Sequence, residues 1–330
     1  MNEPVTRADA INTLGTRTIA VPETACPRST HDSLSRLARL PLWAVFPIYA
    51  PYFALLRRLP GRQAGRLGRL GYPQALWLLR RQRLENFRKV FARRGWSETD
   101  FMRLNAGCLE FQRTLSIELA RLLRRWPHDL RTKVSLIGEE HLKAALQAGR
   151  GAMIIGGHLG NWFYHTTLPA SLGYPVSHVA NELPFPPLEH DLANMRKRFG
   201  LKTIHLGRGG ARHAAEAFER NEIFATLIDL CNRPGHGIEV PFGPTSLTVD
   251  IGPAQLALKH DVPVLLAISR SLGLDRAQMR LVSAVRSADL AGRTPAPEEL
   301  MRLWIEQLFQ EIVQCPEQWW TWSFTRLAAR

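Results

Sequence analysis

Hydrophobic and polar positions follow three different patterns along this 330-residue chain. Residues 1–30 are polar and mixed, with no sustained period, which predicts a flexible arm. Residues 31–132 hold an apolar stretch, then a basic stretch, then a helix predicted over 98–126 by apolar residues at three- and four-residue spacing. From residue 133 to 330 short β-rich runs alternate with helical stretches, which predicts an α/β core with a mixed or largely parallel sheet flanked by helices.

The elements of this core are expected in a regular alternation. Strands are predicted at 134–137, 152–155, 176–180, 203–206, 223–228, 262–269 and 280–285. Helices are predicted at 139–148, 161–172, 187–199, 209–220, 250–260 and 298–314. In the helix predicted before them, Ser97 followed three residues later by Asp100 is typical of a helix start.

The apolar stretch covers residues 40–56, seventeen apolar or small residues without a charge. Its length is at the lower limit for a bilayer span. Pro41, Pro47 and Pro51 interrupt it, and each proline removes a helix donor and disfavours helix at the preceding residue. An interfacial or kinked hydrophobic anchor is therefore favoured over a straight transmembrane helix, with a buried core helix as the alternative.

Positive charge changes the picture of the N-terminal part. The formal net charge is +14, and residues 57–94 carry twelve Lys or Arg against one acid, Glu85. A polybasic segment beside an apolar anchor favours a membrane surface with anionic lipids, and a basic surface also suits an acidic carrier protein. Nucleic acid ranks well below lipid because no recognisable nucleic-acid-binding motif accompanies the charge. Four widely spaced cysteines without a CxxC pair, and no secretory signal in residues 1–20, fit a cytosol-facing protein with reduced thiols.

The candidate reaction centre is the turn after the strand predicted at 152–155. The strand breaks at Gly156-Gly157 and leads to His158, just before a helix predicted to begin near Asn161. A histidine here can serve as a general base, and helix-start donors can hold a phosphate. A metal site on His158 and His165 is disfavoured because no third ligand has a recognisable spacing, and the chain has no G-x-S-x-G elbow of a serine hydrolase. No cofactor is expected.

Six segments in order make the chain, over about residues 35–325, resemble the bacterial lysophospholipid acyltransferase-like family of late lipid A acyltransferases and phosphatidylinositol mannoside acyltransferases. They are residues 83–91, 156–162, 196–200, 237–243, 252–257 and 316–322, with sequences RLENFRKVF, GGHLGNW, RKRFG, GIEVPFG, GPAQLA and PEQWWTW.

The resemblance implies a glycerolipid acyltransferase-like core that moves a fatty acyl chain from an acyl thioester, on acyl carrier protein or coenzyme A, to a lipid hydroxyl. It also implies a site at the cytoplasmic face of a bacterial inner membrane. In the family, a His-x4-Asp/Glu motif supplies the base and its carboxylate, and His158 matches the histidine. Phe163 stands where the acid is expected.

Three explanations of Phe163 remain open. Either another carboxylate, from Asp229, Glu239 or Glu182, orients His158, or His165 contributes, or the chain is a non-catalytic homologue that binds lipid or acyl carrier protein. Arg196 and Arg198, which match a basic pair of the family, are either substrate contacts or solvated cations. Arg270, after a predicted strand, is favoured as a substrate contact, whereas Asn161 is favoured to shape the turn or cap a helix. The full set of substrate-binding candidates is Asn161, His165, Glu182, Arg196, Arg198 and Arg270.

Overall fold

The structure, a computed structural model, describes residues 51–56, 58–60, 63–67, 80–180, 186–205, 209–231, 237–284 and 294–329. The predicted arm 1–30, most of the apolar stretch 40–56 and Glu182 lie outside these residues. Within the described parts of the chain, no helix is both long and apolar enough to cross a bilayer. The predicted hydrophobic anchor at residues 40–56 and the predicted boundary between residues 132 and 133 therefore stay predictions.

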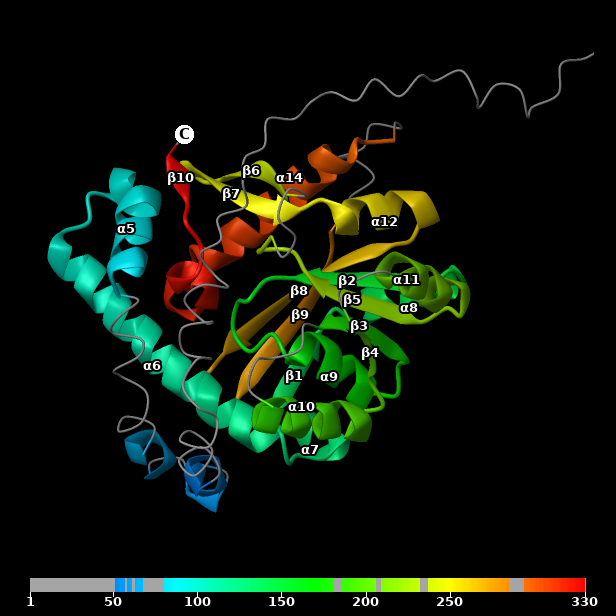
Figure 1. The fold of residues 1–330 in the computed structure, drawn as a ribbon, viewed down its shortest axis with the longest axis horizontal. Coiled ribbons are helices and arrows are strands. Elements are labelled where there is room, and N and C mark those ends of the chain that lie inside the picture. The colour runs from blue at the N-terminus through cyan, green and yellow to red at the C-terminus, as the bar shows by residue number, and fades with distance from the viewer. Residues whose placement is uncertain are drawn as a thin grey trace, which may run out of the picture.

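The described chain forms a seven-stranded sheet with helices on both faces and a small three-stranded sheet beside it (Figure 1). The helices are α5 (Arg80–Phe91), α6 (Glu98–Leu122), α7 (Pro127–Arg131), α8 (Glu139–Gln147), α9 (Tyr164–Ser171), α10 (Pro186–Arg198), α11 (Gly210–Glu219), α12 (Gly252–His260) and α14 (Pro297–Ile312). The strands are β1 (Val134–Ile137), β2 (Ala152–Gly156), β3 (Val176–Ala180), β4 (Lys202–His205), β5 (Ile223–Leu227), β6 (Gly237–Phe242), β7 (Thr245–Asp250), β8 (Val264–Ser271), β9 (Ala277–Ser283) and β10 (Ala328–Ala329). Three short 3-10 helices are η1 (Ala92–Arg94), η2 (Pro316–Gln318) and η3 (Trp320–Ser323).

The large sheet has the strand order β1-β9-β8-β2-β5-β3-β4. All neighbouring strands are parallel except β8 and β9, which are antiparallel, so β1 and β9 run opposite to the other five strands. Strand β2 lies in the middle, with Gly156 at its end opposite Leu227 of β5 and Ala267 of β8. The carboxyl ends of β2, β5 and β8 therefore meet at one edge of the sheet, where ligands bind in open α/β sheets.

Strand β2 is apolar throughout because both faces of the sheet are covered. Met153 and Ile155 belong to one hydrophobic core, which α12 and α14 also contribute to, whereas Ala152 and Ile154 belong to the other, which α7 to α10 contribute to. A parallel strand with helices on both sides requires apolar residues at every position. The predicted α/β fold with a helix-flanked mixed sheet is thus confirmed.

The long helix α6 runs from beside α5 to α7 in Figure 1 and so connects α5 to the α/β core. Its start has the predicted capping box, with Ser97 and Asp100 each bonding the other's backbone. It ends at Leu122, earlier than predicted, because Pro127 opens the separate helix α7.

Most differences from the predicted elements are shifts of a few residues at the ends. The helix predicted at 161–172 begins only at Tyr164, since residues 161–163 form a turn. The small antiparallel sheet β10-β7-β6 was not predicted. Strands β6 and β7 are joined by a two-residue connection, with Gly243 at φ +58°, and Pro241 within β6 hides its strand character in the sequence.

Candidate active site

The turn that carries His158 begins where β2 ends, in the middle of the sheet. The chain leaves Gly156 and pairs with the segment before η3: Gly160 N donates to Gln318 O over 3.0 Å, and Trp320 N donates to His158 O over 2.9 Å. Leu159 and Trp319 form an antiparallel bridge between these two hydrogen bonds. Two of the segments that carry the family resemblance, at 156–162 and 316–322, are therefore held together by backbone hydrogen bonds.

Glycine is required at Gly160 because this residue has φ +61° and lies against the end of β8. A Cβ there would stand 2.1 Å from the carbonyl oxygen of Ser269. The absence of a side chain lets the turn lie directly on the neighbouring strand. This close approach places His158 at the carboxyl edge of the sheet.

Asp229 meets His158 twice. Its Oδ1 lies 2.7 Å from Nδ1 of the imidazole, and its Oδ2 accepts the backbone N–H of His158 over 2.7 Å. Asp229 follows β5, the neighbour of β2, by two residues, and its side chain is fully buried. A carboxylate on Nδ1 holds the ring with its proton on that nitrogen and leaves Nε2 for chemistry.

Several donors keep Asp229 ionised in spite of its burial. Burial by itself raises the pKa of this carboxyl, but the charge and the hydrogen bonds of His158 outweigh that effect. Trp319 adds to them, with its indole N–H donating to Oδ2 over 2.8 Å. The net result is a pKa of Asp229 below its usual value, as hydrogen bonds to the charged form predict.

Aromatic rings surround the imidazole of His158, whose side chain is 14% exposed. Trp162 meets it edge to face at a centroid distance of 4.9 Å, and Trp320 stacks on it at 5.7 Å. Phe163 stacks on the far side of Trp162 at 5.6 Å and packs against the core that contains α7 to α10. The residue in the place of the family's acid therefore extends an apolar wall beside the site.

Helix α5 braces the segment that bears these tryptophans. Asn86 donates to the carbonyl oxygens of Trp322 and Thr325 over 2.9 and 2.6 Å, and Arg83 donates to Ser323 Oγ over 2.9 Å. Arg83 and Asn86 are fully buried. The segments at 83–91 and 316–322, which both carry the family resemblance, therefore pack together.

His165, which was predicted to assist His158, is buried under the same turn. A Cβ at Gly156 would lie 2.6 Å from its ring, so the two are in close contact. Neither ring nitrogen meets a hydrogen-bond partner within the described parts of the chain. Burial and the nearby charge of His158 lower the pKa of His165 to about 3, so it is neutral at pH 7.

Asn161 points away from the site, although it was a substrate-binding candidate. It is fully buried, and its Nδ2 donates to Oε2 of Glu118 on α6 over 3.0 Å. It shapes the turn, as favoured from the sequence, but through a distant acid rather than as a helix cap. Glu118 was not predicted at all.

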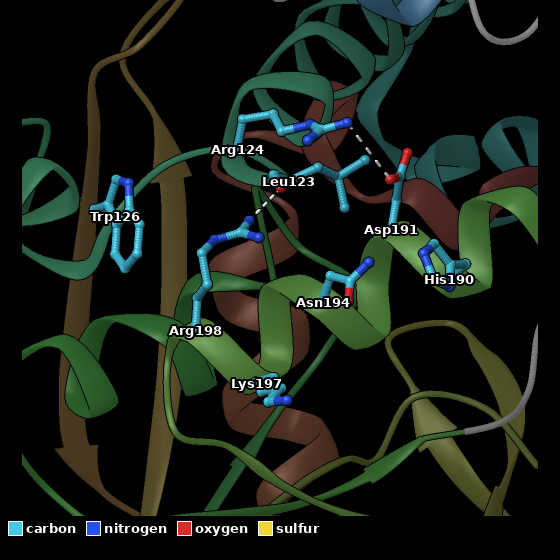
Figure 2. A pocket seen from close by; sticks show the side chains of 8 residues that line it. All are labelled: Leu123, Arg124, Trp126, His190, Asp191, Asn194, Lys197 and Arg198. Carbon is cyan, nitrogen blue, oxygen red and sulfur yellow. Dashed lines mark hydrogen bonds and ion pairs between the residues drawn. The ribbon is translucent and has the colours of Figure 1, made fainter.

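The three arginine candidates all have protein partners. Arg196 is largely buried in an ion pair with Glu189 at 2.6 Å, and Arg270 reaches Glu311 at 2.6 Å. Figure 2 shows Arg198 directed at the carbonyl oxygen of Leu123, in a surface pocket that Arg124 also lines. None of these contacts involves the His158 turn, so substrate binding by these arginines stays a prediction.

Glu239 does not reach the position on Nδ1 that Asp229 occupies. Its side chain is exposed on β6, where Oε2 accepts a hydrogen bond from Ser246 over 3.4 Å. Among the carboxylates named from the sequence, Asp229 is the one that contacts His158 within the described chain. Trp319, which was not among the candidate site residues, also donates to this acid, and no local sequence pattern distinguishes it from Trp322.

A comparison with protein families finds a match over most of the chain. A model of the bacterial lipid A biosynthesis acyltransferases matches residues 40–327. A comparison with curated proteins finds no match. The matched range includes the His158 turn, Asp229, both tryptophans beside them and the brace on α5. The chain therefore belongs to the bacterial lipid A biosynthesis acyltransferase family.

Proposed function

We propose that the protein moves a fatty acyl chain from an acyl thioester to the hydroxyl of a lipid or amphiphile, with His158 as general base and Asp229 as the orienting carboxylate. The observation that carries this proposal is the 2.7 Å contact between Asp229 Oδ1 and His158 Nδ1. Asp229, two residues after β5, supplies the carboxylate that Phe163 lacks. The His-x4-Asp/Glu pattern is incomplete in the sequence, but His158 still contacts a carboxylate, that of Asp229.

The reaction needs no covalent acyl-enzyme. Nε2 of His158 takes the proton of the acceptor hydroxyl while its oxygen attacks the thioester carbonyl carbon. The tetrahedral intermediate then collapses, the C–S bond breaks, and the leaving thiolate takes the proton from His158. Asp229 stabilises the imidazolium between these steps, as a buried carboxylate does in a catalytic triad.

Phe163 favours this reaction over the alternative of a non-catalytic binding homologue. An aromatic side chain that filled the site would separate His158 from any acid. Instead Phe163 lies beyond Trp162 and packs on the core, leaving the His158–Asp229 contact intact. Asp229 is also kept ionised at a buried position, an arrangement that clusters at functional sites.

The partners follow from charge and family. The donor is acyl carrier protein or coenzyme A carrying an acyl thioester, and the acceptor is a lipid at the cytoplasmic face of a bacterial inner membrane. The net charge of +14 suits both an acidic carrier and anionic lipids. The basic residues of 57–94 beside the apolar stretch 40–56 are the proposed membrane contact.

The test is transfer of a radiolabelled acyl chain from acyl carrier protein or coenzyme A to lipid A precursors and lysophospholipids in mixed micelles. His158→Ala should lower kcat at least about 100-fold, the lower range of a general base. His128→Ala is the matched control: His128 also lies beside an acid, Asp129, but on the surface, with its side chain 70% exposed. Turnover that is the same in both variants would remove His158 from the reaction, and wild-type protein that binds these lipids without any turnover would establish the binding homologue.

A further inference from the structure

A second buried acid, Glu118, also contacts the His158 turn. Glu118 lies on α6, 1% exposed, and its Oε2 accepts the Nδ2–H of Asn161 over 3.0 Å. Asn161 is itself fully buried and stands three residues after His158. This hydrogen bond joins the turn to a helix that is more than forty residues earlier in the chain.

We propose that Glu118 is a positioning residue, which holds the far end of the turn so that His158 keeps its alignment with Asp229. The effect of Glu118 on catalysis rests on the proposed function, whereas its effect on the geometry of His158 does not. Glu118 acts through Asn161 and touches neither the imidazole nor Asp229 in any described contact.

The surroundings of Glu118 are polar but incompletely paired. Tyr164 and Ser271 lie within its reach, and the charge of Arg125 acts on it. Arg125 is in turn bound to Asp275 at 2.7 Å. Oε1 of Glu118 and Oδ1 of Asn161 are both buried without a hydrogen-bond partner in the described structure.

Such a pair is a poor source of stability. A buried oxygen without a partner costs free energy, and an apolar pair of similar shape avoids that cost. Burial also raises the pKa of Glu118 to about 7, which shows how little its neighbours compensate the charge. What an acid–amide contact does offer is direction, because a hydrogen bond fixes the orientation of the Asn161 amide and an apolar contact does not.

The turn depends on such fixing from outside because its own backbone is permissive. Gly157 and Gly160 flank His158 and Leu159, and glycines restrict the chain least. The near end is tied by Asp229 at the His158 N–H, and the middle by the pairing with residues 318–320. Glu118 ties the far end, at Asn161.

The test uses two replacements of Glu118 in the full-length protein. Glu118→Leu removes the acceptor, whereas Glu118→Gln keeps an oxygen for Asn161 and removes only the charge. Gln112→Leu is the matched control, since Gln112 is on the same helix and buried, but its Oε1 has no hydrogen-bond partner in the described structure.

The first readout is nitrogen-15 NMR of the histidine rings, with His158 assigned by His158→Ala. In Glu118→Leu the Nδ1 resonance of His158 should lose the shift that marks a hydrogen bond to Asp229, while Glu118→Gln and Gln112→Leu should keep it. The second readout is steady-state kinetics, in which Glu118→Leu should lower kcat about 10- to 100-fold, the scale of a sub-ångström to ångström misplacement, with KM changed about twofold or less. Glu118→Gln should restore kcat to within about threefold of wild type.

Either an unchanged His158 resonance in Glu118→Leu or equal effects of Glu118→Leu and Gln112→Leu would overturn the proposal. If Glu118→Leu does not fold, Asn161→Ala cuts the same hydrogen bond from the other end and should give the same shift of the resonance. Absence of turnover in the wild type would defeat the proposed function alone, because the NMR arm still decides whether Glu118 positions His158.

Discussion

Each end of the His158 turn is hydrogen-bonded to a buried acid, but the pKa values of the two acids are shifted in opposite directions. Asp229 at the near end is surrounded by donors, from the His158 backbone and ring and from Trp319, and its pKa is lowered. Glu118 at the far end accepts from Asn161, with Ser271 and Tyr164 also within reach, but burial outweighs these donors and the charge of Arg125, and its pKa is raised to about 7. Both carboxyls are almost completely shielded from solvent.

The difference shows that donors rather than depth decide the charge of a buried acid. Burial opposes ionisation at both positions, and only at Asp229 do hydrogen bonds and an opposite charge outweigh it. An acid that must stabilise an imidazolium has to be ionised, whereas an acid that orients an amide serves in either form. The chemistry proposed for each end of the turn matches the charge that its surroundings allow.

The largest expected effect comes from changing the same chemical group at the two ends. Asp229→Asn should lower kcat about 10⁴-fold, since the comparable change in serine proteases gives the wrong tautomer of the histidine. Glu118→Gln should change kcat by about threefold or less, because the amide still accepts from Asn161. Acyl-transfer assays on the two purified variants check this, and similar losses in both would erase the distinction between the two acids.

The near end should also fail when its packing is disturbed. A Cβ at Gly157 would lie 2.6 Å from Cδ2 of Leu308 and 3.1 Å from Oδ2 of Asp229. Gly157→Ala should therefore displace the turn from Asp229 and lower kcat about 100-fold. Gly210→Ala is the control, as a Cβ there meets only Ile204, at 4.0 Å, and it should leave kcat unchanged.

Removing one hydrogen-bond donor from Asp229 tests how much that donor stabilises the ionised carboxylate. Trp319→Phe deletes the indole N–H but keeps an aromatic ring against Phe242, which stacks on Trp319 at 4.9 Å. The pKa of Asp229 should rise, and kcat should fall about tenfold, as expected for a hydrogen bond to a charged group. Trp304→Phe makes the same substitution at a buried tryptophan whose N–H has no described partner, so kcat there should stay at the wild-type value.

The smallest effects concern stability against pH. The folded-state pKa of Glu118 is raised from 4.5 to about 7, so the stability that its protonated form confers is lost as pH rises through this window. The pKa of His165 is lowered from 6.5 to about 3, so stability is lost as pH falls through that window, when the unfolded chain takes up the proton. Each slope is at most about 1.4 kcal/mol per pH unit, and the two oppose each other between pH 4.5 and 6.5.

Urea unfolding of single variants separates these slopes. Glu118→Gln should make the free energy of unfolding rise more steeply with pH in this range, and His165→Leu should make it fall. The charged groups near Glu118 are Arg125 and its partner Asp275. Slopes that do not change in opposite directions would mean that one of the two groups keeps its ordinary pKa in the folded protein.

By itself the sequence determined most of the large sheet and the place of the candidate reaction centre. Apolar runs such as 152–155 are long enough and regular enough to specify buried strands, and Gly156-Gly157 after such a run specifies a turn that leads to His158. These are local properties, which the chain carries in adjacent residues. Strands β6 and β7 were missed because Gly237 and Pro241 within β6, and Gly243-Pro244 between the strands, weaken the local strand pattern.

Only the tertiary structure decided which acid serves His158 and what holds the turn. Asp229 was one of three candidate carboxylates until the strand order placed β5 beside β2, with Leu227 opposite Gly156. Glu118 was invisible in the sequence because its helix shows the same apolar period whether the polar side chain meets water or Asn161. Periodicity reports that a face is buried, but the partner of a buried polar group depends on chain segments brought together by folding.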